Sequence, residues 1–347
     1  MQNRFLGSSL QRLSSARAST LSYSMAAPPK ADRNVMAKQL LIITGSHDRT
    51  CDYLASKYKD VRFFRLDLDR FSEYLVSATT KGFEIETEKS KINHASCGGI
   101  YYRKPLMEDL TGTFEQKYHR FAHSEVLSLV DGIVESFDGP CLSKPATLRR
   151  ANNKILQLHL ASRIGFTIPD AAITNAYARI PALHGDKAIV KPLSVGTVDY
   201  EGTREYVQTN IVDKNIDGSL LKFCPSYFQQ YIEKDYELRV TVVGNRFHAV
   251  KIESKNKVDW RKANNEITYS SVDLPDEIVE KCRQLMGLLD MDFGCFDFMV
   301  KDSVTYFLEM NANGQWAWLD AITQFEISKS LINYLTNGKW NEHPQGA

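Results

Sequence analysis

Two apolar segments near the C-terminus carry acids and an amide at positions that most constrain how this chain can fold. Asp297 interrupts the apolar run 296–300, and Glu309 and Asn311 lie two residues apart at the end of the next apolar run. Residues two apart on a strand point to the same face, so Glu309 and Asn311 project together and Asp297 can face them from a neighbouring strand. Three oxygen donors on an apolar sheet are unfavourable unless a cation binds there, and such oxygens suit Mg²⁺ shared with the phosphates of a substrate. The pattern indicates a nucleotide enzyme; the competing interpretation is solvated strand-end acids followed by an ordinary Asn-Gly turn.

Composition excludes several other classes of protein. A chain of 347 residues is long enough for two or three packed subdomains. Its net charge of +1 gives no global field that would favour nucleic acid or an anionic membrane, and it has no apolar stretch long enough for a transmembrane helix. The six cysteines are scattered without a C-x-x-C pair, which favours free thiols over a disulfide framework or a zinc site.

The first 36 residues differ from the rest of the chain. Residues 1–35 hold five basic residues but one acid, Asp32, and are rich in Ser, Ala and Leu. This composition is typical of an organelle transit peptide; the alternatives are an unstructured tail, or a start assigned too early, with Met25 or Met36 as the true beginning. We slightly favour the misplaced start and expect a cytoplasmic protein, with organelle import if the tail is a genuine transit peptide.

The remaining pattern predicts an α/β protein whose C-terminal half is α+β. Strands alternating with helices at the start predict a small parallel α/β unit closed by a helix within 113–137. Pro140 and Pro145 flank a predicted boundary loop, and a helix with an Asn at its N-cap runs to Ile164 before Gly165. Further strands are predicted at 188–192 and, as a meander with a tight turn at Gly244-Asn245, at 227–232, 237–243 and 247–252, followed by a helix at 275–289.

Basic residues and a candidate purine-binding segment appear in the order that a nucleotide between two sheets would need. Lys154 opens a helix whose N-terminus also favours anions, and Lys191 ends a buried strand. A hinge segment offers backbone groups to a purine: Gln229, Gln230, Tyr231 and Ile232. Glu237, Arg239 and Lys251 place alternating charges on adjacent strands. Each assignment has a structural alternative. Lys154 could be a plain lysine at a helix start, Lys191 a lysine at a strand end, and Glu237 with Arg239 a surface ion pair of small energetic weight.

These residues carry a resemblance to a known family. The order Lys, Lys, hinge, E-x-R, Asp, E-x-N is similar to the ATP-grasp superfamily. Three segments resemble the graspetide synthetases, the maturases of microviridin-type peptides: I-Y-Y-R-K-P at 100–105, D-W-R at 259–261 and L-E-M-N-A-N-G-Q-W at 308–316. The resemblance spans residues 38–335. It departs from the family at Lys104, where a second Arg is usual, and in the N-terminal tail.

The resemblance implies an ATP-grasp fold with ATP between two sheets. It divides the chain into a tail (1–36), a pre-ATP-grasp domain (37–142), a central subdomain (143–225) and a C-terminal subdomain (226–340). It implies an ATP-dependent ligase that activates Asp or Glu side chains of a precursor peptide as acyl phosphates and closes ω-ester or ω-amide rings. It also makes a leader-bearing peptide the expected partner and a homodimer a fair expectation, while net charge and hydropathy argue against nucleic acid and membrane.

The resemblance also assigns roles to individual residues. Asp297, Glu309 and Asn311 would hold one or two Mg²⁺, with Mn²⁺ as an alternative ion. Lys154 and Lys191 would hold the α- and β-phosphates of ATP. The hinge residues and Glu237 would bind the rest of the nucleotide. Arg239 would stabilise the acyl phosphate, with Lys251 a weaker candidate. The expected peptide contacts are Arg103, Asp259, Arg261, Asn313 and Gln315, of which Arg103 could equally anchor the first domain to the others.

Two other functions remain open from the sequence. One is an ATP-grasp ligase that joins an amino acid or amine to a small molecule or a protein terminus. The other is an ATP-binding scaffold without turnover, against which the complete set of Asp297, Glu309 and Asn311 argues.

Overall fold

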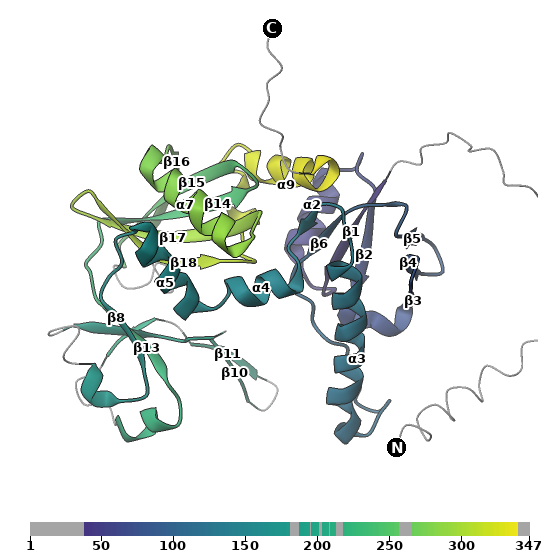
Figure 1. The fold of residues 1–347 in the computed structure, drawn as a ribbon, viewed down its shortest axis with the longest axis horizontal. Helices are drawn as coiled ribbons and strands as arrows, with labels where there is room; N and C mark the ends of the chain where they lie inside the picture. The colour runs from purple at the N-terminus through teal and green to yellow at the C-terminus, as the bar shows by residue number, and fades with distance from the viewer. Residues whose placement is uncertain are drawn as a thin grey trace, which may run out of the picture. The chain divides into compact units, whose positions relative to one another are not determined.

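The computed structural model describes residues 38–180, 187–194, 196–200, 203–207, 209–212, 218–256 and 266–338, and Figure 1 labels its elements. Contacts divide the chain into residues 1–36 and a unit that starts at Ala37, and every element below belongs to the second unit. The predicted tail lies outside the described residues. Among the described helices, none is both long enough and apolar enough to cross a membrane.

A four-stranded parallel sheet with the order β2-β1-β6-β7 forms the centre of the first domain. Its elements are β1 (Gln39–Thr44), α2 (Arg49–Lys57), β2 (Phe63–Asp67), β6 (Cys97–Tyr102), α3 (Gln116–Glu135) and β7 (Cys141–Leu142). Along β1, Leu41 and Ile43 pack in one cluster with α3, whereas Leu40 and Ile42 pack in another with α2. Both faces are therefore buried, as expected for a parallel sheet, and the predicted parallel unit and its closing helix are confirmed.

An antiparallel sheet that the sequence analysis did not predict interrupts this unit. After the 3-10 helix η1 (Leu68–Glu73) come β3 (Leu75–Thr79), β4 (Gly82–Glu86) and β5 (Lys91–Asn93), in the order β3-β4-β5. Phe83 and Ile85 of β4 are buried and join the core of the first domain. The insertion thus extends that core instead of adding a further parallel strand.

Two consecutive helices lead out of the first domain, where the sequence analysis placed a loop and one helix. Pro145 is the first residue of α4 (Pro145–Ala151), a helix that was not predicted; a proline is well suited to that position because its missing N–H has no intrahelical partner there. The next helix, α5 (Lys154–Ile164), agrees with the prediction. The Asn153 side chain accepts from the Leu156 N–H at 3.0 Å, and Gly165 ends the helix at φ 91°.

The central part contains a four-stranded antiparallel sheet with the order β12-β9-β13-β8. Its elements are β8 (Ala171–Thr174), η2 (Tyr177–Arg179), β9 (Ala188–Lys191), the hairpin β10 (Thr197–Tyr200) and β11 (Thr203–Tyr206), β12 (Asn210–Ile211), η3 (Gly218–Lys222) and β13 (Ser226–Gln230). The sequence analysis placed the β13 segment in a meander with the two strands that follow it. That prediction is wrong, because β13 pairs with β8 and β9.

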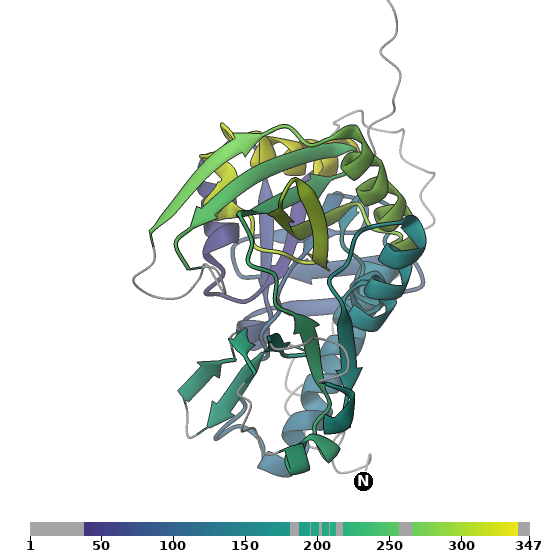
Figure 2. The ribbon, with the colours of Figure 1, turned by 90° about the vertical axis from the view of Figure 1, so that its left-hand side faces the viewer.

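A five-stranded antiparallel sheet with the order β16-β15-β14-β17-β18 forms the C-terminal part. Its elements are β14 (Tyr236–Val243), β15 (Arg246–Ser254), β16 (Ile267–Val272), α7 (Asp276–Leu289), β17 (Phe293–Lys301), β18 (Val304–Asn311), α8 (Ala317–Asp320) and α9 (Glu326–Asn337). Figure 2 shows these green strands and the teal strands of the central part as two separate sheets. The mixed architecture is that of an α/β protein with an antiparallel C-terminal half, which confirms the predicted fold class.

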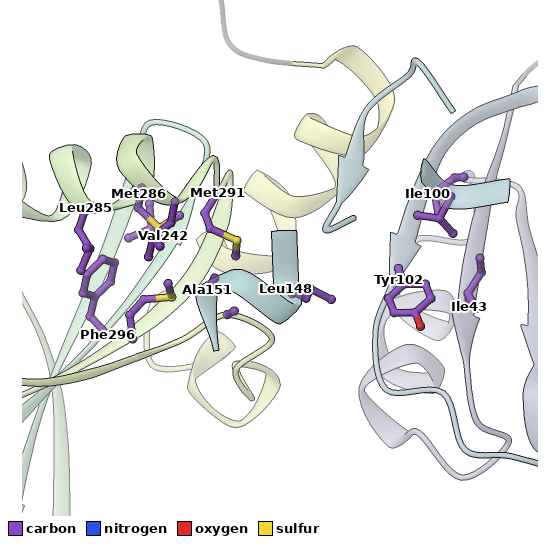
Figure 3. Close-up of a cluster of buried hydrophobic side chains, with 14 of the residues drawn as sticks. Ile43, Ile100, Tyr102, Leu148, Ala151, Val242, Leu285, Met286, Met291 and Phe296 are labelled. Atoms are coloured by element: carbon purple, nitrogen blue, oxygen red, sulfur yellow. The ribbon is translucent and has the colours of Figure 1, made fainter. Parts of the chain in front are cut away.

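The two faces of the C-terminal sheet contribute to different cores. One face packs with α7 and α4, and Figure 3 shows Val242 and Phe296 of the sheet with Met286 of α7 and Leu148 of α4. The other face buries Val250 and Cys295 with Trp316 and with α9, in the cluster that also contains the α2 side of the first sheet. The second face is therefore adjacent to the first domain, and it also carries the predicted metal ligands.

Candidate active site

The predicted acids and Arg239 form one row across three neighbouring strands. Arg239 of β14 lies opposite Asp297 of β17, and Asp297 lies opposite Glu309 of β18. Directly opposed residues share a face of the sheet, so these three side chains project together, as predicted for Asp297 and Glu309. A register shift follows Asp297 and makes Phe298 pair with Phe307.

Arg239 is held by its two terminal nitrogens. Its Nη1 donates to both carboxylate oxygens of Asp297 at 2.7 Å, and its Nη2 donates to the main-chain oxygen of Gln315 at 3.2 Å. Burial would lower the pKa of Arg239, but the Asp297 carboxylate raises it above its ordinary value, so the group stays charged. The Nε is buried and has no hydrogen-bond partner among the described residues. A buried donor of this kind costs free energy unless a ligand accepts from it.

The carboxylates also fit a divalent cation. Asn311 donates from Nδ2 to Asp297 at 2.8 Å and to Glu309 at 3.3 Å, so its amide lies between the two acids. If the Asn311 amide is flipped, its oxygen lies beside the four carboxylate oxygens of Asp297 and Glu309. Such a set of oxygen donors suits Mg²⁺. Two acids are fewer than a protein-only metal cage requires: no group of three or more His, Cys, Asp or Glu in the described chain could hold a metal ion. A site of this kind suits an ion that also takes ligands from substrate phosphates.

Helix α5 brings Lys154 to Glu309. The Lys154 Nζ lies 3.3 Å from Glu309 Oε2 and donates to the Pro192 main-chain oxygen at 2.9 Å. One turn further along, the buried Gln157 fixes the helix to β18, donating to the Met310 oxygen at 2.7 Å and accepting from its N–H at 2.9 Å. Met310 lies between Glu309 and Asn311 in the sequence. By binding the main chain of Met310, Gln157 fixes the position of both neighbouring residues relative to α5. Gln157 was not among the predicted site residues, although a glutamine on the apolar side of a short helix is a signal of such a role.

Lys191 completes the cationic side of the site. Its Nζ donates to Gln229 Oε1 at 2.7 Å, and the Gln229 Nε2 donates in turn to the Tyr227 hydroxyl at 3.1 Å. Burial lowers the pKa of Lys191 to about 8; Glu309 acts in the opposite direction, and Lys154 adds to the lowering. Burial would raise the pKa of Glu309, but the two lysines hold it below its ordinary value, so the acid is ionised at neutral pH.

The hinge segment divides into residues committed to the sheet and residues open to a ligand. The Gln229 side chain positions Lys191, as described above. The Gln230 N–H donates to the Asp170 oxygen at 2.8 Å and the Tyr231 N–H to the Lys187 oxygen at 3.2 Å. Among the hydrogen bonds of the described residues, none uses the N–H of Ile232. Ile232 is therefore the best placed of the four predicted hinge residues to donate to a purine edge.

Glu237 and Lys251 differ in their relation to the site. Glu237 lies two residues before Arg239 on the same face of β14, forms an ion pair with Lys234, and is close enough to Lys191 to influence its pKa. Lys251 lies opposite Leu238, whereas Val250 lies opposite Arg239. Lys251 therefore projects from the other face of the sheet, where it contacts Glu253 at 2.9 Å and the Tyr236 ring at 4.6 Å. The prediction that placed Lys251 beside Arg239 is wrong.

The predicted peptide contacts Arg103, Asn313 and Gln315 form a connection between the first domain and β18. Arg103 is 2% exposed, and its guanidinium donates to the Gln315 side chain. Asn313 donates to the main-chain oxygen of Arg103. The geometry favours the anchoring alternative for Arg103 over a peptide contact. Asp259 and Arg261, the other two, lie outside the described residues.

Comparisons with known proteins agree with this geometry. Residues 39–149 match the model of the MvdD pre-ATP grasp domain. The Chryseobacterium gregarium RiPP-associated ATP-grasp ligase, solved with ADP and a leader and core peptide, is 28% identical, with a TM-score of 0.79 over 89% of this chain and 100% of that one. The Microcystis aeruginosa macrocyclase MdnC, bound to its precursor peptide MdnA, is 27% identical, with a TM-score of 0.74 over 86% of this chain and 99% of that one.

More distant structures show the same fold. The ATP-grasp ligase PsnB, solved with Mg and ADP and a variant of its minimal precursor, is 17% identical, with a TM-score of 0.71 over 87% of this chain and 99% of that one. A search of the curated proteins finds no match. The resemblance that the sequence carries is confirmed: the chain is an ATP-grasp ligase with a pre-ATP-grasp domain of the MvdD type over residues 39–149, and it is similar to the RiPP-associated macrocyclases.

Proposed function

We propose that this protein is a peptide macrocyclase that uses ATP to join side chains of a precursor peptide. The observation that carries the proposal is the row formed by Arg239, Asp297 and Glu309, with an unpartnered donor of Arg239 buried beside two acids. Similarity to a RiPP-associated ligase over 89% of this chain supports the peptide as substrate. The acceptor of the phosphoryl group is an Asp or Glu side chain of that peptide, and the nucleophile is a Ser or Thr hydroxyl or a Lys amine.

The described residues supply binding and charge neutralisation for two successive steps. In the first, an oxygen of the peptide carboxylate bonds to the γ-phosphorus of ATP as the bond to the β,γ-bridging oxygen breaks, giving an acyl phosphate and ADP. In the second, the nucleophile bonds to the acyl carbon, phosphate leaves, and the proton of the hydroxyl or amine is lost. Lys154 and Lys191 hold the α- and β-phosphates, and Ile232 donates to the adenine. Arg239 stabilises the negative charge on the transferred group.

Asp297, Glu309 and Asn311 would hold one or two Mg²⁺, for which Mn²⁺ is an alternative. An ion held there would supply neutralisation of the phosphate charge. Lys154 forms an ion pair with Glu309, and Arg239 forms one with Asp297. Both cations lie where they would be available to phosphate oxygens if a divalent ion were held by the two acids.

ADP formation with different acceptors tests the substrate class. We expect ADP release with ATP and Mg²⁺ to increase when leader-bearing peptides rich in Asp or Glu and in Ser, Thr or Lys are added. Glu309→Gln, which removes a metal ligand but keeps the side-chain volume, should lose this increase and still bind ADP. ADP release that responds to free amino acids and not to the peptides would contradict the macrocyclase and favour the small-molecule ligase.

A further inference from the structure

We infer that Arg103 of the first domain is a positioning residue that fixes the catalytic Arg239 through Gln315. The inference rests on the proposed function, because it concerns the arginine assigned to the transferred phosphoryl group. It assigns the first domain a part in the chemistry, although none of its side chains belongs to the row of Arg239, Asp297 and Glu309.

Arg103 is buried, and each of its three side-chain nitrogens donates to at least one acceptor. Its Nε donates to Asp48 at 2.7 Å, its Nη1 to the Tyr101 hydroxyl at 3.0 Å, and its Nη2 to the Thr50 hydroxyl at 3.1 Å and to Gln315 Oε1. Asp48 is itself the N-cap of α2, where it accepts from the Thr50 N–H at 2.9 Å. The guanidinium is therefore fixed by the strand β6 and the start of α2, and it cannot turn towards a peptide without leaving these partners unpaired.

Gln315 contacts the first domain through its side-chain oxygen and Arg239 through its main-chain oxygen. Its side-chain oxygen accepts from Arg103 and from the Thr50 hydroxyl at 3.1 Å, and its main-chain oxygen accepts from Arg239 Nη2 at 3.2 Å. On the following residue, the Trp316 Nε1 donates to the Tyr101 hydroxyl at 3.0 Å. The first domain therefore fixes the position of the carbonyl that Arg239 contacts.

Gly314 allows this approach. A Cβ at this position would lie 2.5 Å from the Cβ of Cys295 and 3.0 Å from Arg239 Nη2. No side chain fits between the segment and the sheet without displacing one of them. The glycine thus brings the Gln315 carbonyl against the arginine that must be held.

The contact between Arg239 and the Gln315 carbonyl should matter most when nucleotide and a divalent ion are bound. A divalent ion held by Asp297 would compete with Arg239 Nη1 for the carboxylate oxygens and would weaken one of the two contacts that hold the guanidinium. The Gln315 carbonyl would then be the remaining contact that holds the guanidinium, whose Nε has no partner among the described residues. Loss of the Arg103–Gln315 link should therefore reduce stabilisation of the phosphoryl group more than it reduces binding of the nucleotide.

Calorimetric binding of MgADP, with and without aluminium fluoride, tests the inference without knowledge of the peptide. Aluminium fluoride beside ADP stands in for the phosphoryl group in transfer. We expect it to tighten binding to the wild type, and Arg239→Met should lose about tenfold or more of that gain. Gln315→Met removes the acceptor of Arg103 but keeps the main chain, and it should lose a similar factor while MgADP alone binds normally. Gln315→Glu, which restores an acceptor, should keep the gain.

Two further proteins separate positioning from general damage. Lys57→Met breaks another contact between α2 and the C-terminal helices, the ion pair with Asp320 at 2.9 Å, and should lower the melting temperature while keeping the fluoride gain. Combining Gln315→Met with Arg239→Met should cost nothing beyond Arg239→Met alone. A full gain in Gln315→Met, or an equal loss in Lys57→Met, would overturn the positioning role alone. A wild type without any gain would instead refute the role of the site in phosphoryl transfer, and the inference with it.

Discussion

The lowered pKa of Lys191 predicts that nucleotide binding weakens in mildly alkaline solution. Burial brings this pKa down to about 8, and the nearby Lys154 adds to the effect. Phosphate oxygens bind the charged ammonium, so bound nucleotide should raise the pKa of Lys191 again. The protein must then take up a proton on binding at any pH above about 8.

The magnitude follows from the fraction of Lys191 that is charged. One pH unit above its pKa, about a tenth of the side chain carries a proton, so the dissociation constant of MgADP at pH 9 should be about tenfold, or about 1.4 kcal/mol, above its value for the fully charged lysine, and about fivefold above its value at pH 8. Below pH 8 the group is mostly charged and the affinity should level off. The affinity should fall, not rise, with increasing pH. Because the pKa of Lys191 lies below its ordinary value, the lysine is mostly neutral above pH 8 and must be protonated when the nucleotide binds.

Calorimetric titrations with MgADP from pH 7.5 to pH 9.5 measure this slope. Repeating them in buffers of different ionisation enthalpy counts the protons taken up. Lys191→Arg is the matched variant, since an arginine stays charged throughout this range and should abolish both the slope and the proton uptake. A wild-type affinity that is constant across the range, or an equal slope in Lys191→Arg, would refute the reasoning.

Three further changes test the site and its support. Glu309→Gln should reduce Mg²⁺-dependent ADP formation about 100-fold or more with an unchanged circular dichroism spectrum; retained turnover would contradict the metal assignment. Gly314→Ala places a Cβ 2.5 Å from that of Cys295 and should cost about 1–3 kcal/mol in urea denaturation, whereas an unchanged midpoint would show that the segment can move aside freely. Lys57→Met leaves the fully buried Asp320 side chain without its ion-pair partner and should cost about 3 kcal/mol while ADP formation persists; a loss of turnover in folded protein would show that this contact serves catalysis.

The sequence predicted the acid row because strand alternation is a local property. The spacing of two between Glu309 and Asn311 decides their common face without reference to the rest of the fold. The helix from Lys154 could be placed for a similar reason, since an Asn cap and a Gly stop are signals within a few residues of the helix. The assignment to ATP-grasp ligases then followed from the order of these residues along the chain.

Lys251 shows how a local signal can be overlooked. Val243 and Arg246 face each other across the Gly244-Asn245 turn. Counting back along both strands from this turn brings Val250 opposite Arg239 and puts Lys251 on the other face. The sequence therefore contained the information that removes Lys251 from the site, since register in a hairpin follows from loop length.

Other features depended on contacts between distant segments. Whether β13 continues the meander or joins β8 and β9 is decided by which strands pack together in the folded protein, and the alternation within β13 is the same in both cases. The use of Gln229 to hold Lys191 follows from that pairing. Likewise, Arg103 and Gln315 are 212 residues apart, and nothing near either residue indicates the other.

The central claim is that the protein closes rings in a peptide, and intact-mass spectrometry tests it most directly. Candidate leader-bearing peptides that contain Asp or Glu with Ser, Thr or Lys are incubated with the protein, ATP and Mg²⁺. We expect the loss of one water for each linkage, absent with Glu309→Gln, and lability to hydroxylamine then separates esters from amides. Unchanged peptide masses together with ADP release on free amino acids would contradict it.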